Sequence, residues 1–325
     1  MSAARSERGA RASRRPAATA ARSASVVVLG DLVVDVVLLP ARAPERGTDV
    51  PGRVILRQGG SAASTARWLG RLGARVSLVC AIGRDAPGRA LVAAAEADGV
   101  RVRALRVAGR PTGRIGVIVE PGGERSFVTD RAAAFELRPE TLRAAWFAGA
   151  DALHLPAYSL LDRPLGDAGL AATRLAHAAG ALVTVDLASA GPLLAAGRDA
   201  ALALIADAAP DLLFATADEA EALLGTREPD GLLGLAPIAV VKRGRRGATV
   251  LARGGSLRLD VPTTPIDAPD TTGAGDAFDA GFLAAWLPAR RAGLDGHAAL
   301  EAGAVLGNRT ALRHLSHPPG ELPLG

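Results

Sequence analysis

Short apolar segments that alternate with longer amphipathic segments constrain the fold of this chain more than any other feature. The short runs are typical of buried strands, and the stretches between them carry apolar residues at helical spacing. Such alternation predicts an α/β fold whose mostly parallel sheet is covered by helices on both faces. We expect strands at residues 26–29, 76–82, 152–155, 182–186, 212–215, 238–242 and 248–251. We expect helices at residues 61–72, 85–98, 163–179, 191–206, 217–225, 275–287 and 295–310.

Residues 112–130 interrupt this alternation with a pattern typical of a β-hairpin. Two segments rich in β-branched residues, 112–119 and 125–129, flank the turn sequence Glu-Pro-Gly-Gly-Glu at 120–124. Together with residues 36–57, the hairpin would form a small accessory sheet beside the main one.

The positive charge of the chain belongs to its N-terminal end. The net charge of +5 and the sequence pI of about 10.6 would suit a nucleic-acid-binding protein. Residues 1–24, however, contain six arginines and a single acidic residue, Glu7, so residues 25–325 are formally neutral. We therefore expect a disordered basic tail at 1–24, a folded domain at 25–316 and a short tail at 317–325, with no nucleic-acid partner.

The cysteine count and the hydropathy pattern indicate a cytoplasmic protein. Cys80 is the only cysteine, so no internal disulfide can form, which fits a reducing compartment. No uninterrupted apolar run reaches the roughly 18 residues that a membrane-spanning helix requires. We expect no membrane partner.

Residues 270–282 indicate the chemistry. Gly273, Ala274 and Gly275 leave the backbone bare at the start of a predicted helix, where free amides and the helix dipole favour an anion. A carboxylate in the same turn, Asp276, is unexpected in a simple anion site, but it suits a base for a hydroxyl that attacks a bound phosphate. Asp276 could alternatively cap the helix, although that interpretation leaves the glycines unexplained.

The same segment resembles the C-terminal signature of the pfkB family of carbohydrate kinases, the ribokinase-like sugar and nucleoside kinases. Further segments typical of the family follow in the expected order over roughly residues 26–312. They are Gly30-Asp31 through Asp35, Gly59-Gly60 with the helix after it, residues 79–85, Pro111-Thr112-Gly113, Gly123-Glu124-Arg125, Asp218-Glu219 and Val241-Lys242-Arg243-Gly244.

The resemblance implies a fold and an activity. The fold would be a ribokinase-like three-layer αβα sandwich with a central, mostly parallel sheet and a small β lid from about residues 36–57 and 110–130. The activity would be an ATP-dependent, Mg²⁺-assisted transfer of the γ-phosphoryl to a hydroxymethyl group of a sugar or related polyol. Lids of this family often pair between subunits, so we expect a homodimer. We also expect the protein to bind a small sugar-like substrate.

The resemblance also assigns roles at the reacting centre. Asp276 matches the catalytic base, and the anion hole for the transferring phosphoryl matches Gly273, Ala274 and Gly275. The positions that match substrate contacts are Asp35, Gly59, Gly60 and Ser64.

Further positions match the nucleotide and metal sites of the family. Those expected near the nucleotide are Lys242, Gly244, Gly247, Thr216 and Glu219. Glu219 also matches a glutamate that organises water and Mg²⁺ near the phosphates. Asp270 and Thr272 match positions that hold a monovalent cation such as K⁺ in part of the family, although Asp270 could equally cap a turn.

Lys242 is the only lysine of the chain, and it ends a predicted strand. A compact ammonium suits a phosphate contact, and ligands of parallel sheets bind beyond the strand ends. A single lysine could also survive by chance among so many arginines.

The chain departs from the family pattern in several places. Thr216 and Ser64 stand where the family usually has asparagine, which removes an amide donor at each position. Residues 309–316 lack the glycine-alanine turn that lines the cation and adenine region. Ser61 stands where ribose-phosphorylating members carry a longer cation, which does not favour ribose.

These departures leave alternatives open. The chain could be a nucleoside kinase of the same family, or a degenerate member that binds a sugar or nucleotide with little turnover. The scarcity of aromatic residues near the predicted pocket weakens the nucleoside alternative. A hexose, a ketose or a sugar acid all remain candidate substrates.

Overall fold

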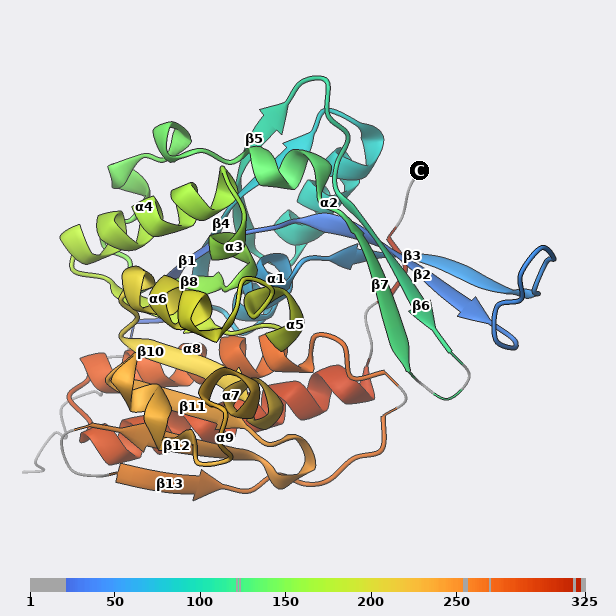
Figure 1. Cartoon of the computed structure of the whole chain (residues 1–325). Helices are drawn as coiled ribbons and strands as arrows, with labels where there is room; N and C mark the ends of the chain where they lie inside the picture. Colours follow the sequence, from blue (N-terminus) through green and yellow to red (C-terminus); the bar gives the residue numbers. More distant parts are fainter. Residues whose placement is uncertain are drawn as a thin grey trace, which may run out of the picture.

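The computed structural model describes residues 22–120, 122, 124–253, 257–268, 270–317 and 320–322. Most of the predicted basic tail, residues 1–21, and parts of the predicted C-terminal tail lie outside the described residues. The described residues form one large sheet between two helical layers, with one small sheet beside it (Figure 1). The predicted three-layer α/β sandwich with a separate small sheet is therefore confirmed.

The large sheet has the strand order β13-β12-β11-β10-β9-β8-β1-β4-β5. The strands from β11 to β5 in this order run parallel, and β12 and β13 are antiparallel additions at one edge. Most of these strands are apolar throughout because helices bury both of their faces. Their bounds are β1 (Ser25–Leu29), β4 (Arg75–Gly83), β5 (Val100–Val107), β8 (Ala152–Pro156), β9 (Leu182–Asp186), β10 (Leu212–Thr216), β11 (Ile238–Lys242), β12 (Ala248–Ala252) and β13 (Leu257–Val261).

Helices cover both faces of this sheet. One face carries α1 (Ser61–Arg71), α2 (Ala86–Ala97), α8 (Ala274–Arg291) and α9 (Gly296–Ser316). The other carries α3 (Tyr158–Leu161), α4 (Leu165–Ala178), α5 (Ala190–Leu193), α6 (Arg198–Ala208) and α7 (Ala217–Leu224). The pleat of β1 divides its side chains between the two cores, with Val26 and Val28 in the first and Val27 and Leu29 in the second. Short 3-10 turns lie at Ala132–Glu136, Pro139–Thr141, Ala144–Trp146, Pro229–Gly234 and Gly244–Arg246.

The small sheet has the order β3-β2-β6-β7, and we call it the lid. Its strands are β2 (Val33–Pro40), β3 (Gly52–Gly59), β6 (Arg114–Val119) and β7 (Arg125–Asp130). The pairs β2–β3 and β6–β7 are antiparallel, and β2–β6 is parallel. The lid has an apolar core of its own, formed by Val33, Val37, Ile55, Ile115, Val117 and Ala134.

The sequence-based boundaries miss some features. The strands β5 and β13 were not expected, since β5 alternates valine with arginine as an edge strand and β13 is similarly polar on one face. The helix expected at 163–179 corresponds to α4, and the short helix α3 before it was not expected. The helix expected at 191–206 is divided into α5 and α6.

The candidate site lies where the parallel strands end. Gly30 and Asp31 follow β1, while Asp186, Thr216 and Lys242 are the last residues of β9, β10 and β11. Carboxyl ends of parallel strands share one edge of the sheet, so these side chains gather there. None of the described helices has both the length and the hydropathy that a membrane span requires.

Candidate active site

The loop before α8 has backbone geometry that would suit the predicted anion site. Gly273 precedes the helix with a φ of 80°, a left-handed conformation that favours glycine. The amide of Ala274 donates to the carbonyl of Thr271 at 3.2 Å. The amides of Gly275 and Asp276, the next in the first turn, have no earlier carbonyl of the helix to bond. Two backbone donors and the positive end of an 18-residue helix therefore converge on the end of this loop.

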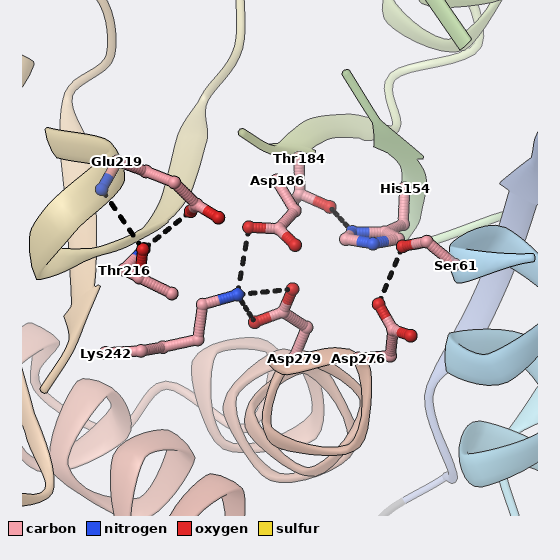
Figure 2. A network of polar contacts seen from close by, with 9 residues as sticks. All are labelled: Ser61, His154, Thr184, Asp186, Thr216, Glu219, Lys242, Asp276 and Asp279. Atoms are coloured by element: carbon pink, nitrogen blue, oxygen red, sulfur yellow. Dashed lines mark hydrogen bonds and ion pairs between the residues drawn. The ribbon is translucent and has the colours of Figure 1, made fainter. Parts of the chain in front are cut away.

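Asp276 lies in the first turn of α8 and accepts a hydrogen bond from Ser61. The hydroxyl Oγ of Ser61, the first residue of α1, lies 2.6 Å from Asp276 Oδ1 (Figure 2). Burial raises the pKa of Asp276 to about 7, with Asp186 adding to the rise and the Ser61 hydrogen bond opposing it. A carboxylate with a pKa near neutrality can accept a proton from an alcohol and release it afterwards.

The Ser61 contact was not expected from the sequence. Ser61 follows Gly59-Gly60 at the start of a helix, and that helix begins at the edge of the sheet where the predicted ligands lie. The position of the serine at a helix N-terminus was the available signal, but nothing in the sequence fixes which side chain it faces.

Asp35 and the glycine loop are adjacent, as a shared substrate site requires. A Cβ atom added to Gly59 would lie 1.8 Å from Asp35 Oδ1, so only glycine leaves room for this carboxylate. Burial, together with nearby Asp31, raises the pKa of Asp35 to about 7, while Arg57 opposes the rise. Gly60 caps the N-terminus of α1. Ser64 lies one turn further along the same helix.

A second acidic group lies at the end of β1. Asp31 is 4% exposed, and its Oδ2 atom is 3.3 Å from Nη1 of Arg131. The Arg131 guanidinium also lies over the ring of Tyr158, 4.5 Å from its centroid. The sequence pattern included Gly30-Asp31, but no role followed from it. The negative charge of Asp31 adds to the rise in pKa that burial causes at Asp35 and at Asp276.

Lys242 is held by two aspartates. Its Nζ atom lies 2.9 Å from Asp186 Oδ1 and 3.2 Å from Asp279 Oδ1, and its side chain is 9% exposed (Figure 2). Burial alone would lower the pKa of Lys242, but the two carboxylates outweigh burial and raise it, so the ammonium stays charged. A Cβ atom added to Gly275 would lie 3.2 Å from Nζ. The ammonium therefore lies close to Gly275 in the predicted anion site. Its predicted contact with a phosphate stays a prediction.

Thr216 and Glu219 form a capping box at the start of α7. The Thr216 amide donates to Glu219 Oε2 at 2.8 Å, and the Glu219 amide donates to Thr216 Oγ1 at 3.2 Å. Burial, together with Asp186, raises the pKa of Glu219. The Thr-x-x-Glu spacing was a readable signal for this cap. The predicted nucleotide and Mg²⁺ roles of the two residues stay predictions.

The two predicted glycines after β11 belong to a tight connection. Gly244 begins a short 3-10 turn, and Gly247 follows it with a backbone that approaches Val261. A Cβ atom at Gly247 would lie 2.1 Å from the Val261 carbonyl, so this glycine has a packing role whether or not it also lies near a nucleotide.

Asp270 and Thr272, the predicted cation ligands, contact arginines of the lid. Arg57 Nη1 lies 3.1 Å from Asp270 Oδ2, and Arg125 Nη2 lies 3.2 Å from Asp270 Oδ1. Arg125 Nη1 also donates to Thr272 Oγ1 at 2.7 Å. Asp270 caps the turn as well, since its Oδ1 accepts from the Thr272 amide at 2.9 Å.

No protein cage for a divalent ion is present among the described residues. These contain no group of three or more His, Cys, Asp or Glu side chains placed to hold a metal ion.

Comparisons with known proteins agree with the geometry. The model of the pfkB family carbohydrate kinases matches residues 23–319. An ATP-dependent ribose-1-phosphate kinase of Halopiger xanaduensis is 34% identical over 278 residues, covering 81% of this chain and 84% of the relative. The probable fructokinase-4 of Arabidopsis thaliana is 29% identical over 277 residues, covering 82% and 83%.

A solved structure shows the same fold. The adenosine kinase from Sinorhizobium meliloti superposes with a TM-score of 0.78 at 27% identity, covering 93% of this chain and 96% of the other. The sequence relatives named as a ribose-1-phosphate kinase and a fructokinase, and the solved structure named as an adenosine kinase, are thus all similar to this chain over most of its length.

Proposed function

Because this chain belongs to the pfkB family of carbohydrate kinases, we propose that it transfers the γ-phosphoryl of ATP to a primary alcohol of a sugar or related polyol. The observation that carries the proposal is the position of Asp276. Its carboxylate lies in the first turn of α8, beside bare backbone amides, and already accepts a hydrogen bond from a hydroxyl, that of Ser61.

The chemistry follows from these positions. Asp276 takes the proton of the substrate hydroxyl while the oxygen of that hydroxyl forms a bond to the γ-phosphorus. The bond between this phosphorus and the β–γ bridging oxygen breaks, which releases ADP. The amides at the start of α8 stabilise charge on the transferring phosphoryl. Because the transition state is loose, positioning and charge neutralisation matter more than a strong base.

The substrate is proposed to bind between the lid and the sheet. Asp35 would accept hydrogen bonds from sugar hydroxyls, and Gly59 and Gly60 would allow the backbone to approach closely. Asp31 and Arg131 would add polar groups to the proposed substrate site. Closure of the lid would exclude water from the phosphoryl during transfer.

Mg²⁺ would arrive with the nucleotide. When bound, the ion would neutralise phosphate charge, and Glu219 is the candidate to orient its water ligands. Lys242, held behind Gly275, would contribute a fixed positive charge to the same region.

The domain limits, the compartment and the oligomeric state belong to the proposal as well. We propose a kinase domain at 25–316 with short tails at 1–24 and 317–325, in a reducing cytoplasm. Exposed apolar side chains on the edge strands of the lid, Val54, Phe127 and Val128, favour a homodimer through the lid. Analytical ultracentrifugation would show a monomer at micromolar concentration if this assignment is wrong.

An assay coupled to ADP release, run over a panel of substrates, tests the function. The panel would contain fructose, ribose, ribose 1-phosphate, a sugar acid and adenosine. Turnover of one sugar well above the others supports the proposal. Ligand-dependent thermal stabilisation without turnover would instead identify a binding protein, the alternative motivated by Ser64 and Thr216.

A further inference from the structure

The oxygens predicted to bind a monovalent cation are engaged by protein donors. Both carboxylate oxygens of Asp270 pair with guanidinium groups, and the hydroxyl of Thr272 accepts from Arg125. Each of these oxygens would have to exchange a charged or polar partner for the cation.

The main-chain carbonyl of Thr272 is engaged too, by His314. The indole N–H of Trp68 donates to Nδ1 of His314 at 3.2 Å, so Nδ1 is an acceptor and Nε2 carries the proton. Nε2 then donates to the Thr272 carbonyl at 2.7 Å. His314 belongs to residues 309–316, where the family's glycine-alanine turn is missing, and in this protein that segment continues the helix α9.

The two arginines come from opposite edges of the lid. Arg57 is on β3 and Arg125 is on β7, the first and last strands of the sheet. Arg57 is paired with Asp35, and Arg125 with Val119, so strand alternation places both arginines on the face that also carries Asp35. Both edges of the lid therefore contact the single carboxylate of Asp270.

The local charge opposes a further cation. Asp270 supplies one negative charge, and Arg57 and Arg125 supply two positive charges at hydrogen-bond distance. All three side chains are at least two-thirds shielded from solvent, so the attraction is less screened than at an open surface. The residues present therefore do not fit a monovalent cation.

We propose that Arg57 and Arg125, acting from the lid, take the structural place of a monovalent cation beside the anion-site loop. We call Arg57, Arg125, Asp270 and Thr272 the arginine latch. It has two consequences, both of which rest on the proposed kinase function. Phosphoryl transfer is independent of K⁺, and closure of the lid orders the loop that leads to Asp276. The two arginines are positioning residues, since they contact the loop and not the reacting atoms.

The first test compares cations at equal ionic strength. The wild-type protein is assayed in KCl, NaCl and choline chloride, and the dissociation constant of Mg·ADP is measured by calorimetry in the same buffers. We expect kcat/KM to differ by no more than about twofold among the three salts, and the dissociation constant likewise, because the salts act only through screening, which is equal at equal ionic strength. A K⁺-specific gain of about tenfold or more in either quantity would overturn the proposal.

The second test removes the latch. In R57Q/R125Q we expect kcat to fall by about 10- to 100-fold, the effect of a misplaced catalytic loop, and the amides of β7 and residues 270–276 to exchange faster with deuterium. R114Q is the matched control, because Arg114 lies on the opposite face of the lid and its side chain has no hydrogen bond or ion pair to another described residue. If R57Q/R125Q behaves like R114Q, the latch does not exist.

A charge-preserving variant guards against a general folding defect. R57K/R125K keeps both charges but loses the planar guanidinium fork, so we expect a loss of kcat between those of R114Q and R57Q/R125Q. Calorimetry and deuterium exchange require no turnover. If no substrate is phosphorylated, the proposed function fails, while these two measurements still decide the latch.

Discussion

Asp276 combines two features that suit the base that we propose. Its carboxylate is shielded enough for a pKa of about 7, and a hydroxyl donor, Ser61, fixes the orientation of one oxygen. An aspartate with an ordinary pKa would be ionised at all physiological pH values, so its protonation would not limit the proposed transfer in that range. The position of Asp276 therefore makes the activity sensitive to pH near neutrality.

The pH dependence has a definite sign. Asp276 must be ionised to accept the proton, so kcat/KM falls as pH decreases below about 7, by up to tenfold per pH unit. Asp35, with a similar pKa, steepens this acid limb because its ionised form is the better hydrogen-bond acceptor. The pH profile of kcat/KM measures both effects.

Removal of the Ser61 hydroxyl should move that limb. The hydrogen bond stabilises the ionised form of Asp276, so Ser61→Ala raises its pKa. We expect the acid limb of kcat/KM to shift upward by about one pH unit, the value of one hydrogen bond. Ser64→Ala is the comparison, since it removes a hydroxyl from the same helix without a hydrogen bond to Asp276. An unshifted limb in Ser61→Ala would show that the serine does not tune the base.

At the scale of elements, Lys242 ties three of them together. It ends β11, while its partners Asp186 and Asp279 belong to β9 and α8. The helix α8, which carries Asp276, is thereby attached to two strands of the sheet, β9 and β11. Three carboxyl groups, including Glu219, surround this one ammonium, so its loss leaves unpaired buried charge.

The substitution Lys242→Met separates the two roles that Lys242 could have. If the lysine is chiefly a tie between elements, the variant loses about 3–5 kcal/mol of unfolding free energy, as when one partner of a buried pair is removed. Chemical denaturation measures this loss. Arg245→Met, which breaks an exposed pair with Asp267, should cost at most about 1 kcal/mol. Unchanged stability with a greatly raised KM for ATP would instead identify the phosphate contact that the sequence predicted.

At the scale of the whole molecule, the sequence is sufficient to predict the architecture and the glycine-rich start of the helix α8. Buried parallel strands are short and apolar, so their alternation with helices can be recognised without any tertiary information. The loop from Gly273 to Asp276 is local in sequence, and its glycines and carboxylate act within one turn of helix. Edge strands such as β5 are harder to recognise from the sequence, because one of their faces is exposed and carries arginine.

Contacts between distant residues could not be predicted in this way. Ser61 and Asp276 are 215 positions apart, and Arg57 and Asp270 are 213 apart. Whether an arginine at the edge of a lid reaches a loop depends on the curvature of the sheet and on how it docks. The residue types at Asp270 and Thr272 matched a cation site. Their partners Arg57 and Arg125, which make the local net charge positive, come from the other half of the chain.

The most direct test of the kinase assignment is single-turnover transfer by Asp276→Asn compared with the wild-type protein. Excess enzyme is mixed with Mg·ATP and the best substrate of the panel, and phosphorus NMR follows the sugar phosphate. We expect the wild-type protein to convert the substrate, and Asp276→Asn to bind Mg·ADP normally while transfer slows by about 10²- to 10⁴-fold. Transfer at the wild-type rate by Asp276→Asn would contradict the role of Asp276, and with it the central claim about this site.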